Sequence, residues 1–137
     1  MTMRYLAIDL GAKRTGLAVG DDETKIATPA GIIETASAEQ RLDMIHRAIR
    51  EHQPGALVVG LPLNMDGSEG PAGRRARQFA RQLEARSALS VHLADERLSS
   101  DAADDHMTRS GLTHKAKKAR RDALAAAEIL RRFLERR

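Results

Sequence analysis

The chain contains no cysteine, which excludes disulfide bridges, zinc–thiolate sites and thiol catalysis and is compatible with a reducing compartment. Tryptophan is also absent, and the aromatic residues are Tyr5, Phe79 and Phe133. Proteins that hold single strands by base stacking need exposed aromatic platforms. A nucleic-acid partner would therefore be recognised here mainly through its backbone and its shape.

Long hydrophobic runs are missing as well. The apolar stretches fall far short of the ~20 residues of a membrane span, and Asp9, Lys13 and Arg14 interrupt any signal-peptide pattern in the first 20 residues. We expect a cytoplasmic protein that has no contact with a membrane.

Length and charge suggest one domain with a basic end. The 137 residues fit a single domain, 1–137, that can bury about two thirds of its unfolded surface. Net charge is +4, but residues 1–108 hold 13 Lys and Arg against 16 Asp and Glu, whereas residues 109–137 hold 10 against 3. Such a segment suits a phosphate-rich partner, and a solvated helix face is the alternative interpretation.

The apolar pattern predicts an α/β fold. Strands are expected at 4–10, 15–20, 26–33, 56–61 and 89–93, with helices at about 37–53 and 72–83, a short helix ending near 109, and a final helix at about 118–135. Ser37 and Gln40 form a capping-box pattern at the first helix. Three strands in a meander followed by strand–helix–strand give a five-stranded mixed sheet flanked by helices, the order of ribonuclease H-like folds.

Acidic residues occupy three unusual places in this pattern. Asp9 ends an apolar strand, Asp95 and Glu96 follow the last strand, and Asp122 lies on the apolar face of the final helix, four residues before Ala126. Carboxylates that point inward together repel one another unless protons or a divalent cation balance them. Oxygen ligands suit Mg²⁺ or Mn²⁺, so the cluster predicts a metal site of the kind that hydrolyses phosphodiester bonds.

Each acid also has a structural interpretation. Asp122 could be an acid favoured by the helix dipole, and Arg97 could neutralise Asp95 or Glu96 in a turn. Asp9 is harder to explain in this way, because a turn rarely needs an acid inside the strand.

Basic residues near these acids are candidates for holding a nucleic-acid backbone. Lys13 and Arg14 follow Asp9, Arg74 opens the second long helix, and Arg97 follows Glu96. A further group directly precedes Asp122: Lys115, Lys117, Lys118, Arg120 and Arg121. The five histidines show no metal-ligand spacing and are interpreted as surface residues, His92 included.

Four blocks of sequence resemble the YqgF/RuvX family of ribonuclease H-like nucleases. They are IDLGAKRTGLA (8–18), VGLP with MDGSEG (59–62 and 65–70), DERLSS (95–100) and RDALAAAEIL (121–130). The resemblance implies a catalytic triad of Asp9, Glu96 and Asp122, with Asp95 the less favoured middle acid, and dependence on Mg²⁺ or Mn²⁺. Two activities are attached to such proteins: trimming the 5′ end of the 16S ribosomal RNA precursor, and cutting Holliday junctions in DNA recombination and repair.

The family pattern is followed with mild departures, and other classes of function stay open. Serines 99 and 100 replace the usual threonines, Gly20 replaces a serine, and Arg121 replaces an apolar residue. One alternative is an ATP-binding domain of the actin, sugar-kinase and Hsp70 type, which however binds nucleotide between two such domains. Another is a non-catalytic nucleic-acid-binding module. For a nuclease, a homodimer would favour branched DNA and a monomer would favour an RNA precursor.

Overall fold

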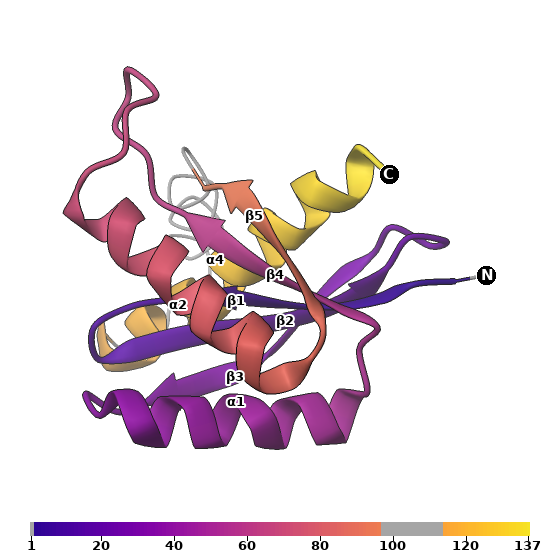
Figure 1. Ribbon diagram of the computed structural model, residues 1–137, viewed down its shortest axis with the longest axis horizontal. Helices are drawn as coiled ribbons and strands as arrows, with labels where there is room; N and C mark the ends of the chain where they lie inside the picture. Colours follow the sequence, from indigo (N-terminus) through magenta and orange to yellow (C-terminus); the bar gives the residue numbers. More distant parts are fainter. Residues whose placement is uncertain (1, 97–113) are drawn as a thin grey trace.

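In the computed structural model the chain folds into a five-stranded mixed sheet with helices on both faces (Figure 1). The structure describes residues 2–96 and 114–137, with side chains of the second range from residue 122 onward. The elements are β1 (Arg4–Asp9), β2 (Arg14–Asp21), β3 (Ala27–Glu34), α1 (Ala38–His52), β4 (Ala56–Leu61), α2 (Pro71–Ser87), β5 (Ser90–Asp95) and α4 (His114–Glu135).

The strand order is β3-β2-β1-β4-β5, and the direction of pairing follows from the length of the connections. Short turns join β1 to β2 and β2 to β3, so these pairs are antiparallel. Helices α1 and α2 lead into β4 and β5, so β1–β4 and β4–β5 are parallel. The predicted α/β fold with three antiparallel strands and a strand–helix–strand unit is confirmed.

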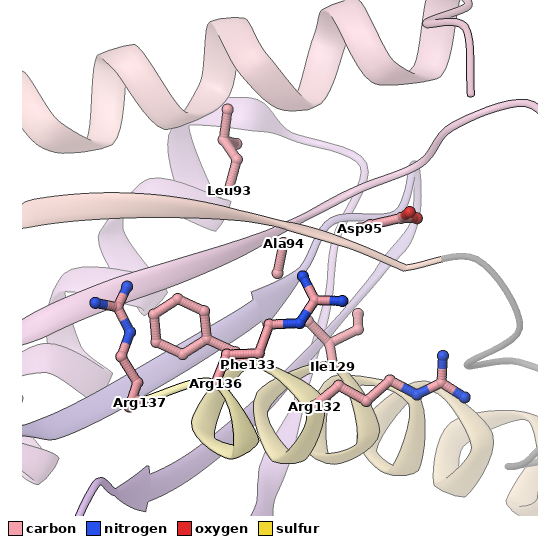
Figure 2. A pocket seen from close by; sticks show the side chains of 8 residues that line it. All are labelled: Leu93, Ala94, Asp95, Ile129, Arg132, Phe133, Arg136 and Arg137. Carbon is pink, nitrogen blue, oxygen red and sulfur yellow. The ribbon is translucent and has the colours of Figure 1, made fainter.

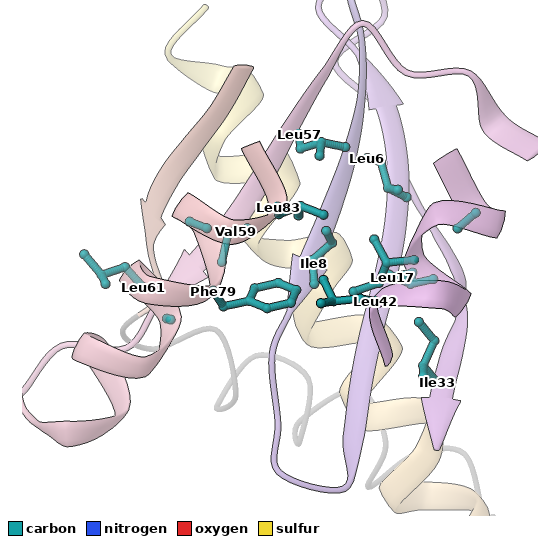
Figure 3. Close-up of a cluster of buried hydrophobic side chains, with 14 residues drawn as sticks. Leu6, Ile8, Leu17, Ile33, Leu42, Leu57, Val59, Leu61, Phe79 and Leu83 are labelled. Atoms are coloured by element: carbon teal, nitrogen blue, oxygen red, sulfur yellow. The ribbon is translucent and has the colours of Figure 1, made fainter. Parts of the chain in front are cut away.

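Large aliphatic side chains cover the face of the sheet toward α1 and α2 (Figure 3). Leu6 and Ile8 of β1 alternate onto this face, as do Leu57 and Val59 of β4. The helices contribute Leu42, Ile45, Ala48, Ala76, Phe79, Ala80 and Leu83. Burial of this many aliphatic groups is the main source of stability on this side.

Small residues line the opposite face, where α4 lies. Ala7, Ala18 and Ala56 belong to this second cluster, together with Ala126 and Leu130 of the helix. They allow a close approach of α4, which is closest at Gly16 of β2 and is tight at Gly20 as well. A Cβ atom on Gly16 would lie 2.1 Å from the backbone oxygen of Asp122, and one on Gly20 would lie 3.2 Å from Leu130. The packing therefore brings Asp122 directly onto the sheet.

The first helix begins largely as predicted. The Ser37 hydroxyl accepts a hydrogen bond from the N–H of Gln40 at 3.2 Å. The reciprocal half of the capping box is absent from this described turn: the Ser37 N–H donates instead to the hydroxyl of Thr35 at 3.1 Å. Gln53, with φ of 48°, ends the helix just before Pro54.

Two other boundaries differ from the prediction. Helix α4 begins at His114 rather than near residue 118, because the lysine- and alanine-rich stretch before Asp122 consists of good helix formers. Strand β5 continues to Asp95, so this acid ends the strand instead of following it. The short helix predicted to end near residue 109 lies outside the described residues. No helix in the described ranges combines the length and the apolar character that a membrane crossing requires.

Candidate active site

Asp9 and Glu96 meet at one end of the sheet, on the face that α4 covers. Asp9 is the last residue of β1, and it alternates onto the same face as Tyr5 and Ala7. Glu96 directly follows β5, where its N–H donates to the carbonyl of Leu61 at 3.3 Å. The two carboxyl groups are hydrogen-bonded to each other. Two of the three predicted acids are therefore in direct contact.

A glycine in β4 provides the space for this contact. A Cβ atom on Gly60 would lie 2.4 Å from Oε2 of Glu96 and 2.9 Å from Cδ1 of Ile129. The carboxyl group of Glu96 thus reaches across the end of β4 toward Asp9. The sequence reasoning did not single out Gly60, although an isolated glycine inside a strand pattern is a known signal of close approach.

Asp122 reaches the same region from α4. Its backbone packs against Gly16, which pairs with Asp9 across the β1–β2 hairpin. Its side chain is half-buried, and its negative charge contributes to raising the pKa of Asp9. Among the described side chains, those of residues 2–96 and 122–137, no three from acidic, histidine or cysteine residues stand closely enough to hold one metal ion. Asp122 therefore adjoins the Asp9–Glu96 pair without joining it.

Asp95 lies on the opposite face of the sheet from Glu96. Successive residues of a strand alternate between faces, so Asp95 is on the side opposite to Glu96, and it is exposed. Its charge still acts on its neighbour by helping to raise the pKa of Glu96. This geometry favours Glu96 over Asp95 as the partner of Asp9.

The surroundings of the half-buried Asp9–Glu96 pair favour its protonated form. Burial raises the pKa of Glu96 to about 9, and the charge of Asp9 and the hydrogen bond to it act in the same direction. Burial also raises the pKa of Asp9; the hydrogen bond with Glu96 opposes this rise and the charge of Asp122 adds to it. The pair therefore favours holding one proton in the hydrogen bond between its two carboxyl groups.

Such a donor set fits a hard divalent cation. Carboxylate oxygens are the ligands that Mg²⁺ and Mn²⁺ prefer, and a cation can balance the negative charges that a proton balances here. Asp9 and Glu96 are held in place by β1, β4 and β5, so the fit rests on positions fixed by the sheet.

The predicted basic contacts are placed only in part. Lys13 and Arg14 line a pocket of about 760 Å³ together with Asp122, and Nε of Arg14 lies 3.5 Å from the carboxylate of Glu34. Arg74 is exposed in the first turn of α2. The remaining candidates lie outside the described side chains: Arg97, Lys115, Lys117, Lys118, Arg120 and Arg121.

The prediction for His92 was wrong. This histidine is half-buried, and its ring lies 6.1 Å from that of Tyr5 and 5.3 Å from that of Phe133, measured between centroids. It faces α4 because it alternates with Val91 and Leu93, which pack against the other face. The alternation is visible in the sequence, but the sequence does not show which helix covers this face.

Solved structures of junction-cleaving proteins share this fold. The fowlpox virus resolvase, solved in a complex with substrate Holliday junction DNA, has a TM-score of 0.61 at 11% identity, with 98% of each chain covered. RuvC of T. thermophilus, in complex with a Holliday junction substrate, has a TM-score of 0.56 at 17% identity, covering 98% of this chain and 95% of that one. At these identities the likeness concerns the fold alone.

Curated relatives are much more similar in sequence. A protein of Anaeromyxobacter sp. (strain Fw109-5) named "Putative pre-16S rRNA nuclease" is 44% identical over 133 residues, 97% of each chain. A protein of Thiobacillus denitrificans with the same name is 44% identical over 130 residues, 95% of this chain and 90% of its own. The family model RuvX, described as Holliday junction resolvase, matches residues 3–136. With this match along nearly its whole length, the chain belongs to the RuvX family.

Proposed function

We propose that this protein is a divalent-metal-dependent nuclease that hydrolyses phosphodiester bonds of structured nucleic acid. The observation that carries the proposal is the half-buried, hydrogen-bonded Asp9–Glu96 pair at the end of the sheet, with Asp122 beside it. Membership of the RuvX family and the names of its relatives support the same activity. A site built to bind ATP between two domains has no comparable need for two buried carboxyl groups in contact.

Each acid has a distinct part in this proposal. Asp9 and Glu96 bind Mg²⁺ or Mn²⁺, Asp122 completes the negative charge around it, and Asp95 adds charge from outside the pair. When bound, the cation makes a water molecule more acidic and stabilises negative charge on the leaving oxygen. Glu96 gives up its proton on metal binding, because a carboxylate must be ionised to act as a ligand.

Basic residues around the acids position the substrate. Lys13 and Arg14 line the pocket that reaches Asp122, where they would bind a phosphate next to the scissile one. Arg74 stands at the start of α2 as a further contact. The basic residues before Asp122 and Arg97 remain candidates for the same role.

Two substrates are compatible with this chemistry. The names of the 44% identical relatives favour a 16S rRNA precursor; we propose that its 5′ end is the part trimmed and that this takes place in the cytoplasm. The family description and the junction complexes of the fold favour a four-way DNA junction. Junction resolution needs two active sites acting together, so a homodimer would accompany that activity and a monomer would accompany trimming.

The test compares both substrates under the same conditions. We expect wild-type protein to cleave one or both with Mg²⁺ or Mn²⁺ and to stop when the cation is chelated. The variant Asp9→Asn should keep its fold and its affinity for nucleic acid but lose roughly a thousandfold in cleavage rate, a size typical of removing one group that stabilises charge in the transition state. Full activity of this variant would refute the mechanism. A solution mass measured in parallel distinguishes monomer from dimer.

A further inference from the structure

A second pocket, of about 290 Å³, lies between strand β5 and the last turns of α4 (Figure 2). It is lined on one side by residues 93–95 and on the other by Arg132, Arg136 and Arg137, with Phe133 and Ile129 between them. Three arginines and one aspartate give the lining a positive balance. The sequence reasoning noted the basic end of the chain but did not name these residues.

Two of the arginines are held in place by neighbours. The guanidinium of Arg137 lies 4.3 Å from the centre of the Phe133 ring, and its Nη2 lies 3.3 Å from Nδ1 of His92. Phe133 is itself fixed by an edge-on contact with Tyr5, at 5.2 Å between centroids. Nε of Arg132 donates to Glu128 at 3.2 Å. Fixed cations lose little conformational freedom on binding an anion, which favours affinity.

The other wall of the pocket is the edge of the described sheet. The N–H of Glu96 points toward β4, so by alternation the N–H groups of Leu93 and Asp95 point outward. The N–H of Val91, two residues before Leu93, donates to a carboxylate oxygen of Glu84 at 3.1 Å. In Figure 2 the side chain of Leu93 points away from α4, so this residue offers mainly backbone to the pocket. Outward N–H groups on this edge are donors suited to anionic oxygens.

The pocket begins where the active site ends. Asp95 lines it and is followed directly by Glu96. Ile129 also lines it, and the same side chain stands beside Glu96 over Gly60. A strand of nucleic acid that enters the active site can therefore continue past Asp95 to the arginines at the end of α4.

We propose that this pocket binds the phosphate backbone of the substrate strand that flanks the scissile phosphate. The inference rests on the proposed nuclease function and adds a path for the strand. Arg132, Arg136 and Arg137 neutralise its phosphates, and the edge of β5 donates to them. Recognition here is independent of base sequence, in keeping with the scarcity of aromatic platforms.

The experiment measures the affinity of labelled RNA and DNA at several salt concentrations in the absence of divalent cation. The variants are Arg136→Gln, whose side chain is exposed, and the double variant Arg136→Gln with Arg137→Gln. The matched control is Arg47→Gln with Arg50→Gln, which removes two exposed arginines from α1 on the other side of the sheet. Thermal unfolding checks that each variant is folded.

We expect the affinity to fall roughly threefold to tenfold for each arginine removed from the pocket. The slope of log K against log salt should decrease by about 0.7–0.9 for each phosphate that the variant no longer neutralises. With saturating substrate and Mg²⁺ or Mn²⁺, kcat should stay within about twofold, because these residues bind the flank and not the reacting phosphate. The control should bind like wild type.

The outcomes separate this inference from the proposed function. If the pocket variants bind as tightly as wild type, or no more weakly than the control, the inference is wrong while metal-dependent cleavage stands. If wild-type protein binds neither nucleic acid, both are wrong.

Discussion

The two faces of the sheet differ in what they bury. Toward α1 and α2 the side chains are large and aliphatic, whereas toward α4 they are mostly alanine and glycine with acids at one end. Large side chains separate a helix from a sheet and fill the gap with apolar atoms. Small ones let backbone approach backbone, so that polar groups at the end of the interface are held in fixed positions. One face mainly stabilises the fold, and the other mainly positions the acids.

The largest effect should come from a mutation that creates a cavity on the aliphatic face, because it should lower stability without changing catalysis. Leu83 of α2 is fully buried there, and Leu83→Ala should lower the free energy of unfolding by about 2–5 kcal/mol. The acids lie on the opposite face, so kcat per folded molecule should not change at temperatures well below the transition. Urea unfolding and single-temperature kinetics check the two parts. A parallel loss of kcat would show that the faces are not independent.

A methyl group added on the face toward α4 should disturb the acids themselves. Gly60→Ala places a Cβ atom 2.4 Å from Oε2 of Glu96, so the Asp9–Glu96 contact must shift. We expect the free energy of unfolding to fall by about 1–3 kcal/mol. We also expect weaker binding of the metal, measured as a higher Mg²⁺ concentration for half-maximal cleavage rate. Gly70→Ala is the matched control, because its Cβ would meet Asn64 at an ordinary 3.6 Å with φ of −95°.

The smallest expected effect is electrostatic. Because the pKa of Glu96 is raised to about 9 from 4.5, the folded protein keeps a proton that the unfolded chain loses, so its stability falls as pH rises from about 4.5 to about 9. Glu96→Gln stays neutral and should escape this fall. With a chelator present, we expect the two proteins to differ little at pH 4 and the variant to be the more stable of the two at pH 9.

The control for this pH effect is an acid outside the pair. Glu39 lies in the first turn of α1 and is exposed. Glu39→Gln should show no gain at pH 9. An equal gain in both variants would attribute the effect to net charge rather than to the buried pair.

Much of this arrangement was predictable because it depends on local pattern. Strand alternation and the cap at Ser37 specify the elements, and the position of Asp122 on an apolar face predicts that it turns toward the sheet. It is harder to predict which helix covers each face of the sheet and which strands pair. Strand β5 extends to Asp95 because this residue pairs with Leu61 of β4. The residues around Asp95 do not by themselves indicate that pairing. The burial of His92 likewise depends on which helix covers its side of the strand.

The candidate site was predictable as a set of residues but not as a geometry. Position and resemblance point to Asp9, Glu96 and Asp122, and the structure places the first two in contact and the third nearby. The glycines that permit this, Gly16 and Gly60, signal a close approach in the sequence but not which atoms approach, because those atoms belong to distant parts of the chain. For the arginines of the second pocket, the sequence shows only that the end of the chain is basic. Their position opposite β5 depends on how α4 packs on the sheet.

The close seating of α4 on Gly16 has a consequence for how the protein comes into being. Asp9 is synthesised well before Asp122, and the two adjoin only after α4 has docked. Contacts between such distant parts of a chain form late in folding. A partly synthesised chain therefore carries Asp9 without Asp122, so the capacity to cut nucleic acid arises only after α4 has been made and has docked on the sheet.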